Sequence, residues 1–80
     1  MNILSQNGKA LINYNNIVSI NMESTDNIWR IKTTYNSGSY IILAVFYTED
    51  ECKNTFDKLC NKIKISRESD TIDFGDLWDD

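Results

Sequence analysis

The residues that most often do chemistry in proteins are few in this sequence. It has no histidine, and its two cysteines are Cys52 and Cys60. If both lie on one helix, they are about 12 Å apart along its axis, whereas a disulfide needs Cα atoms within roughly 7 Å. Zinc would have too few ligands without a histidine or a CxxC pair. We therefore interpret the cysteines as small core residues, and we predict no metal site and no cofactor.

The acidic residues do not form a pattern that indicates catalysis. A general base or nucleophile is usually a histidine, a cysteine in an electropositive pocket, or one of two acids held in a cleft. Here the acids gather at the start of a predicted helix and in residues 68–80. Asp73-Phe74-Gly75 matches the metal-binding tripeptide of protein kinases, but the chain has no room for a kinase domain. We expect a protein that is not an enzyme and has no catalytic residues.

The charge of the chain is unevenly distributed. The net charge is −4, yet residues 1–67 hold eight basic and six acidic side chains, a net of +2. Residues 68–80 hold six acids and no base. The acidity of the protein therefore belongs to its C-terminal segment.

The C-terminal segment also carries large apolar residues between its carboxylates. Such a composition is typical of segments that become ordered on a partner, with charge steering the encounter and aromatic side chains providing buried area. We expect it to dock a protein partner together with one residue of a predicted strand, through Asp70, Asp73, Phe74, Asp76, Leu77, Trp78, Asp79, Asp80 and Trp29. The alternative is that the segment folds back, with its aromatic residues covering an apolar patch and its acids meeting Lys9, Arg30 or Lys32.

Short strands separated by polar turns are predicted over the first part of the chain. Asn7-Gly8 predicts a type I′ hairpin, and Asn15-Asn16 predicts a second tight turn. In the strand that follows, Val18, Ile20 and Met22 alternate and are expected on one face.

Two further strands differ in character. Residues 29–35 alternate between an apolar face and a polar, basic face that carries Arg30 and Lys32. Residues 39–46 are apolar on both faces, so this strand is expected to be central or covered twice. The basic cluster is small and the chain is acidic, so we do not expect direct binding to nucleic acid.

One amphipathic helix is predicted over residues 48–64. Thr48 and Glu51 fit a capping box, with acids at the first turn and lysines near the end, as the helix dipole favours. An apolar stripe follows at helical spacing, formed by Cys52, Phe56, Leu59, Cys60 and Ile63. These elements predict an α+β fold, an antiparallel meander of four or five strands with the helix packed on one face. We expect one domain over residues 1–65 and an acidic-aromatic tail over residues 66–80.

Three motifs resemble a group of small uncharacterised proteins of Firmicutes and their phages and prophages. They are the opening Ser5-Gln6-Asn7-Gly8-Lys9, the turn Asn15-Asn16 and the helix start Tyr47-Thr48-Glu49-Asp50-Glu51. The resemblance covers residues 3–64 and implies no activity, ligand or site residue. If it reflects a phage origin, the small size and acidic charge are similar to those of host-takeover proteins and anti-CRISPR proteins.

We therefore expect a non-catalytic protein-interaction module, and within that class an inhibitor, from a phage or other mobile element, of a nucleic-acid-handling host protein. The alternative is a structural or self-associating protein whose C-terminal segment closes its own core or that of a neighbouring subunit. The longest apolar stretch, residues 40–47, is far below the roughly 18 to 20 residues of a membrane span. No basic and then apolar N-terminal signal is visible, so we expect a cytoplasmic protein.

Overall fold

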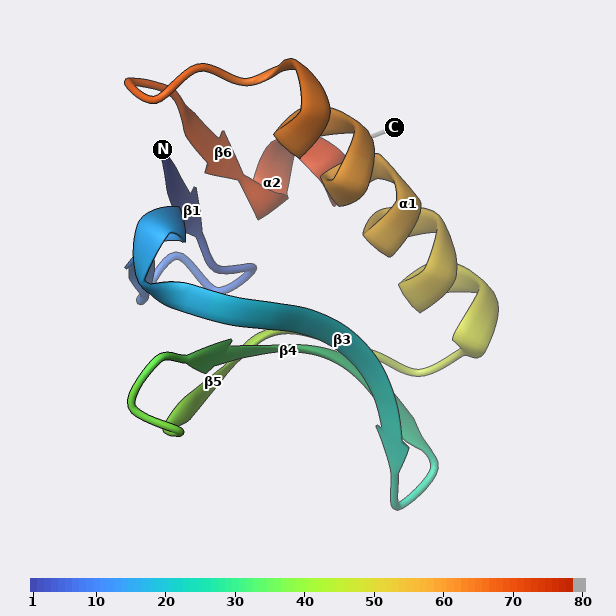
Figure 1. The fold of residues 1–80 in the computed structure, drawn as a ribbon. Coiled ribbons are helices and arrows are strands. Elements are labelled where there is room, and N and C mark those ends of the chain that lie inside the picture. Colours follow the sequence, from blue (N-terminus) through green and yellow to red (C-terminus); the bar gives the residue numbers. More distant parts are fainter. Residues whose placement is uncertain (79–80) are drawn as a thin grey trace.

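The computed structural model describes residues 1–78 of the chain (Figure 1). In chain order the elements are β1 (Asn2–Leu4), β2 (Leu11–Asn13), the 3-10 turn η1 (Tyr14–Asn16), β3 (Ile17–Thr25), β4 (Ile28–Tyr35), β5 (Tyr40–Phe46), α1 (Glu49–Ile65), β6 (Thr71–Asp73) and α2 (Phe74–Trp78). The predicted α+β class is confirmed.

The strands form two sheets of three strands each. β3, β4 and β5 form an antiparallel meander, and the second sheet has the order β2-β1-β6, in which β6 runs parallel to β1. The single meander of four or five strands is therefore not what the structure shows. Local alternation predicts that a segment is a strand, but it does not say which strand lies beside it, and β1 takes a neighbour from the far end of the chain.

The tight turns place Gly, Asn and Asp residues at positive φ angles, but the turn at Asn7-Gly8 differs from the predicted type. Gly8 has a φ of 73°, but Asn7 does not have the positive φ that a type I′ turn needs. The connection between β1 and β2 also spans residues 5–10 and is longer than a two-residue turn. The Asn7 side chain accepts hydrogen bonds from the Ser5 hydroxyl at 2.8 Å and the Lys9 backbone at 2.9 Å. The two-residue turn with two positive φ angles is at Asp26 and Asn27, with 49° and 67°. It joins β3 to β4.

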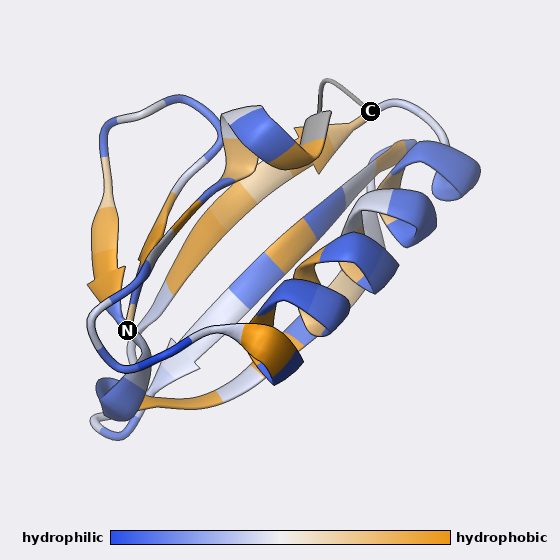
Figure 2. Ribbon diagram, turned by 90° about the horizontal axis from the view of Figure 1, so that it is seen from above, coloured by the Kyte–Doolittle hydropathy of each residue, from blue (hydrophilic) through white to orange (hydrophobic). Residues whose placement is uncertain are grey.

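Helix α1 confirms the predicted helix to within one residue at each end. The Thr48 hydroxyl accepts the backbone N–H of Glu51 at 3.2 Å, as an N-cap should. Cys52, Thr55 and Leu59 are buried on the inner side of the helix, and Phe56 and Ile63 pack partly against the core. Figure 2 shows that most of α1 is coloured as hydrophilic, with a hydrophobic segment at one of its ends, and that several strands carry hydrophobic segments.

The hydrophobic core draws on both sheets, on α1 and on the C-terminal segment. Its buried members are Ile3, Ile12, Ile31, Leu43, Ala44, Phe46, Cys52, Leu59, Ile72, Phe74 and Leu77. The boundary expected at residue 66 therefore does not separate a core from a free tail, because the last three of these residues follow it. Full burial of an Ile, Leu or Phe side chain contributes roughly 1.5–3 kcal/mol to the free energy of unfolding.

Strand β5 is an edge strand of its sheet, which differs from the expected central or doubly covered position. Its free edge is partly covered by Gln6, whose backbone N–H donates to the carbonyl of Leu43 at 2.8 Å. The Gln6 side-chain oxygen accepts the backbone N–H of Val45 at 3.0 Å. On the outer face Tyr40 and Val45 remain exposed. Gln6 thus links the two sheets.

Across residues 1–78, no helix has the length and apolar character needed to cross a bilayer.

Candidate protein-binding site

The C-terminal segment is attached to the N-terminus of the chain. β6 pairs with β1 in the register Asn2 with Thr71, Ile3 with Ile72 and Leu4 with Asp73. The backbone N–H of Asn2 also donates to the carbonyl of Asp70 at 3.0 Å, and the amino group of Met1 donates to the carbonyl of Glu68. The segment is therefore ordered by its own chain.

Two of the apolar side chains expected to meet a partner, those of Phe74 and Leu77, are in the core. Phe74 is 1% exposed and Leu77 is 2% exposed. The Lys58 ammonium donates to the carbonyl of Leu77 at 3.4 Å, which holds α2 against α1. The burial of Phe74 agrees with the fold-back alternative, and Leu77 is buried in the same core.

The acids of the segment that are within the described chain serve its local geometry. The Asp70 carboxylate accepts the backbone N–H of Arg67 at 2.7 Å, and the Asp73 carboxylate accepts that of Gly75 at 2.8 Å at the start of α2. Asp76 is exposed. None of the ion pairs found among residues 1–78 involves these three acids. Asp79, Asp80 and the side chain of Trp78 lie outside the described part of the chain.

Asp70, Asp73 and Asp76 line one shallow hollow together with Lys62, with a volume of about 190 Å³. Two of the three carboxylates are occupied by backbone N–H groups. Among the described residues no group of three acids or cysteines is arranged to hold a metal ion.

Trp29, the docking residue expected outside the C-terminal segment, lies on β4. It pairs with Phe46 of β5 and Ser24 of β3, and it packs partly buried against the core. Its position on the inner face explains the alternation seen in the sequence. Trp29 and the described C-terminal segment are on different elements, and Trp29 does not line the hollow formed by Asp70, Asp73 and Asp76.

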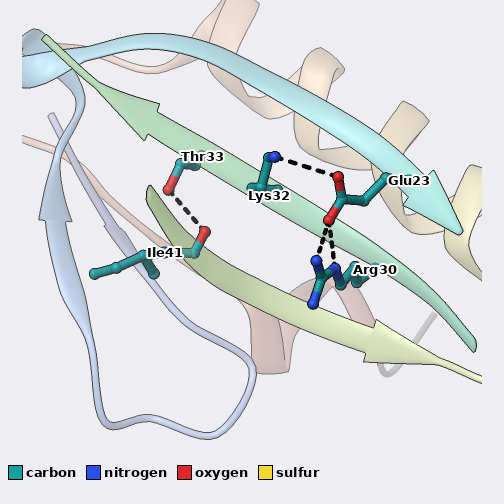
Figure 3. A network of polar contacts seen from close by, with 5 residues as sticks. All are labelled: Glu23, Arg30, Lys32, Thr33 and Ile41. Atoms are coloured by element: carbon teal, nitrogen blue, oxygen red, sulfur yellow. Dashed lines mark hydrogen bonds and ion pairs between the residues drawn. The ribbon is translucent and has the colours of Figure 1, made fainter. Parts of the chain in front are cut away.

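The basic face of β4 is neutralised in part by β3. Figure 3 shows the Glu23 carboxylate between Arg30 and Lys32. One carboxylate oxygen contacts Nε and a terminal nitrogen of Arg30, and the other lies 3.2 Å from the Lys32 ammonium nitrogen. The hydrogen bond from Arg30 lowers the pKa of Glu23 below its ordinary value, and Lys32 adds to the effect. The Lys32 ammonium also lies 4.9 Å from the centre of the Tyr40 ring. Arg30 and Lys32 together exceed the charge of Glu23 by one positive charge, so this face would attract phosphates only weakly.

A second hollow is an apolar groove between β3 and α1. Its volume is about 350 Å³. One wall is formed by the start of β3 with Tyr14, and the other by α1. The lining residues are Tyr14, Ile17, Val18, Ser19, Ile20, Phe56, Leu59, Cys60, Ile63 and Lys64. We call this hollow the β3–α1 groove.

Beside this groove β3 has a free edge. Within residues 1–78, β3 pairs with β4 only. Its nine residues contain no proline and no lysine, two of the features that proteins commonly place on exposed edges to prevent pairing, although its start carries a bulge, which is a third. In Figure 1, β3 runs in front of β4 at the near edge of the sheet. The groove lies beside the first four residues of this strand, Ile17 to Ile20.

A β-bulge gives the start of β3 its unusual exposure. The register with β4 shifts between Ile17 and Ser19, leaving Val18 without a partner. Val18 is consequently 67% exposed, whereas Ile20 and Met22 pack against the core. The prediction that all three share one face is wrong for Val18, because the extra residue changes the alternation.

Sequence reasoning did not identify the β3–α1 groove. Strand 17–22 and the helical stripe were both predicted, but their proximity was not. The sequence signal for the groove is the width of the apolar stripe on α1, to which Phe56, Cys60 and Ile63 add residues beyond the fully buried ones.

Comparison with known protein families, with characterised proteins and with solved structures finds no match to this chain.

Proposed function

We propose that the chain is a non-catalytic protein-interaction module that accepts an extended segment of protein as an added strand along β3. The observation that carries this proposal is the open edge of β3 next to the apolar β3–α1 groove. Strand addition uses both features, because the edge provides backbone hydrogen bonds and a neighbouring pocket selects alternate side chains.

The chemistry of the groove defines the segment that fits it. Its walls are mainly apolar, from Ile17 and Ile20 on the strand and Phe56 and Ile63 on the helix. In an added strand every second side chain points to the same face. The bound segment should therefore have β-branched or other aliphatic residues at alternate positions, and no proline at positions that must donate to β3.

The C-terminal segment is less suited to be the docking surface. Contact through Phe74 and Leu77 would require β6 and α2 to leave the core, which would expose three buried apolar side chains. That the partner is a nucleic-acid-handling host protein, inhibited by a phage-type protein, rests on the resemblance and on the acidic charge. It stays a prediction, and the cytoplasm remains the expected location.

The proposal is tested by titrating the isotope-labelled protein with synthetic eight-residue peptides in which Val or Ile alternates with Ser or Thr. We expect amide chemical-shift changes along β3 and the groove side of α1. Val18→Lys should weaken this binding, because an edge lysine opposes strand pairing. Leu11→Lys is the matched control, since Leu11 on β2 is similarly exposed, at 61%, and does not line the groove.

Two results would contradict the proposal. One is shift changes confined to another surface, such as the acidic hollow. The other is equal loss of binding in Val18→Lys and Leu11→Lys, which would indicate a general charge effect.

A further inference from the structure

We infer that the segment accepted by β3 is β3 of a second copy of this chain, so that two molecules form one continuous sheet across a two-fold axis. This inference rests on the proposed function, since it names the occupant of the same edge. An antiparallel pair of identical edges is isologous, the arrangement found in most homodimers.

The groove brings the start of β3 and the second half of α1 together, and the inferred two-fold axis lies beside it. Its strand wall, Ile17 to Ile20, is centred beside Ser19, and its helix wall, Phe56 to Lys64, is centred on Cys60. Because Ser19 and Cys60 line the same groove, we place the inferred axis, perpendicular to the sheet, beside both residues. Two copies would then pair their β3 strands and bring the exposed sides of their α1 helices together over the new pair.

The charges along α1 suit this contact. Asp57 and Lys64 are seven residues apart, about two helical turns, so they lie on the same side of α1. Across an axis near Cys60 the helices run antiparallel, which directs Asp57 of one copy toward Lys64 of the other. Within one copy Asp57 is already paired with Lys53 at 3.4 Å, and both remain more than half exposed. The intermolecular pair would extend this ion pair into a short network.

The charges of β3 and of the C-terminal segment do not oppose the contact. Glu23 is the one charged residue of β3 and is held by Arg30 and Lys32 of its own chain. In a pairing centred on Ser19, the two Glu23 side chains lie on opposite sides of the axis. None of the described C-terminal acids lines the groove. The repulsion expected between two acidic proteins is therefore located away from this surface.

The apolar surface on both walls also needs a cover. Val18 is 67% exposed, and Phe56, Cys60 and Ile63 are only partly buried by their own chain. Pairing two copies would bury this strip against an identical strip. A single contact would then pair the free edge of β3 and cover the apolar groove.

The two cysteines provide a direct test of the axis. Cys60 lies in the groove wall and is partly exposed, whereas Cys52 is 0% exposed, and burial raises the pKa of its thiol, with Glu49 adding to the effect. A short bis-maleimide should therefore link Cys60 to Cys60 of the second copy in the folded protein. Cys60→Ser should abolish the linked dimer, and Cys52→Ser should leave it unchanged.

Sedimentation equilibrium of the full chain over a wide concentration range completes the test. We expect a monomer–dimer equilibrium whose dissociation constant rises roughly tenfold or more in Val18→Lys, about 1.4 kcal/mol or more, with little change in Leu11→Lys. A dimer that is insensitive to Val18→Lys, or that does not cross-link through Cys60, would overturn the inference because the contact would lie elsewhere.

The outcomes separate this inference from the proposed function. A protein that stays monomeric but binds the alternating peptides along β3 would overturn the second copy as occupant and retain strand addition. A monomer that binds none of those peptides would overturn both.

Discussion

Ile3 and Ile72 are paired residues on neighbouring parallel strands, and both are buried, at 0% and 4% exposure. They stand near opposite ends of the sequence. Between them the chain forms the entire antiparallel sheet and α1, so the first and last strands close the fold together. The segment that gives the chain its net negative charge is for this reason a structural part of the domain.

The C-terminal segment should be required for stability. We expect Phe74→Ala to lower the free energy of unfolding by about 3–5 kcal/mol, because it removes a large side chain that is 1% exposed. Tyr47→Ala is the matched control, since that aromatic side chain is 84% exposed and its loss should cost less than about 0.5 kcal/mol. Urea unfolding followed by circular dichroism measures both. Equal, small effects would mean that the segment does not pack in the core.

The ion pairs of Glu23 should make stability depend on pH in a defined direction. Its pKa is lowered in the folded state, mainly by the hydrogen bond from Arg30. A lowered folded pKa means that the stabilisation is complete above the unfolded pKa, about 4.3, and is lost as the pH falls through the lower folded value. Wild type should thus be more stable than Glu23→Gln near pH 7, and the difference should vanish in acid.

Thermal unfolding of both proteins between pH 7 and pH 2.5 measures this difference. Glu68→Gln, at an exposed acid outside the ion pairs of the described residues, is the control. A difference between wild type and Glu23→Gln that is constant over the whole range would show that its origin is not ionisation of Glu23.

The N-cap of α1 should make a modest contribution to the free energy of unfolding that can be measured by itself. Thr48→Ala removes the hydroxyl that accepts the Glu51 backbone N–H, and we expect a loss of about 1 kcal/mol in the free energy of unfolding. Thr48→Ser keeps the hydroxyl and should retain most of the stability. Chemical denaturation measures all three proteins. If Ser and Ala destabilise equally, the methyl group and not the cap is responsible.

The predictability of each element follows the range of the interactions that form it. Thr48, Glu51 and the stripe from Cys52 to Ile63 interact within a few residues, so the helix was predicted almost to its ends. The turn at Asn7-Gly8 was predicted with the wrong type, because the Asn7 side chain forms hydrogen bonds to Ser5 and Lys9 in place of a tight two-residue reversal. The bulge at Val18 was not predicted either, since alternation alone does not reveal an added residue.

The candidate site was harder to predict than the fold class. Phe74 and Leu77 among carboxylates have the composition of a docking segment, and a segment that folds back onto its own chain has the same composition. The free edge of β3 depends on strand order, which is a property of the whole sheet. Neither question has a local answer.

The α+β class, the helix α1, several strands and the separation of acidic from basic residues could be predicted from the sequence, because periodicity, capping and charge are local. The tertiary structure decided that β6 pairs with β1, that Ile72, Phe74 and Leu77 are core residues, and that β3 has a free edge beside an apolar groove. The physical reason is that strand pairing and burial depend on which apolar surfaces meet, and in this chain those surfaces are contributed by segments far apart in the sequence.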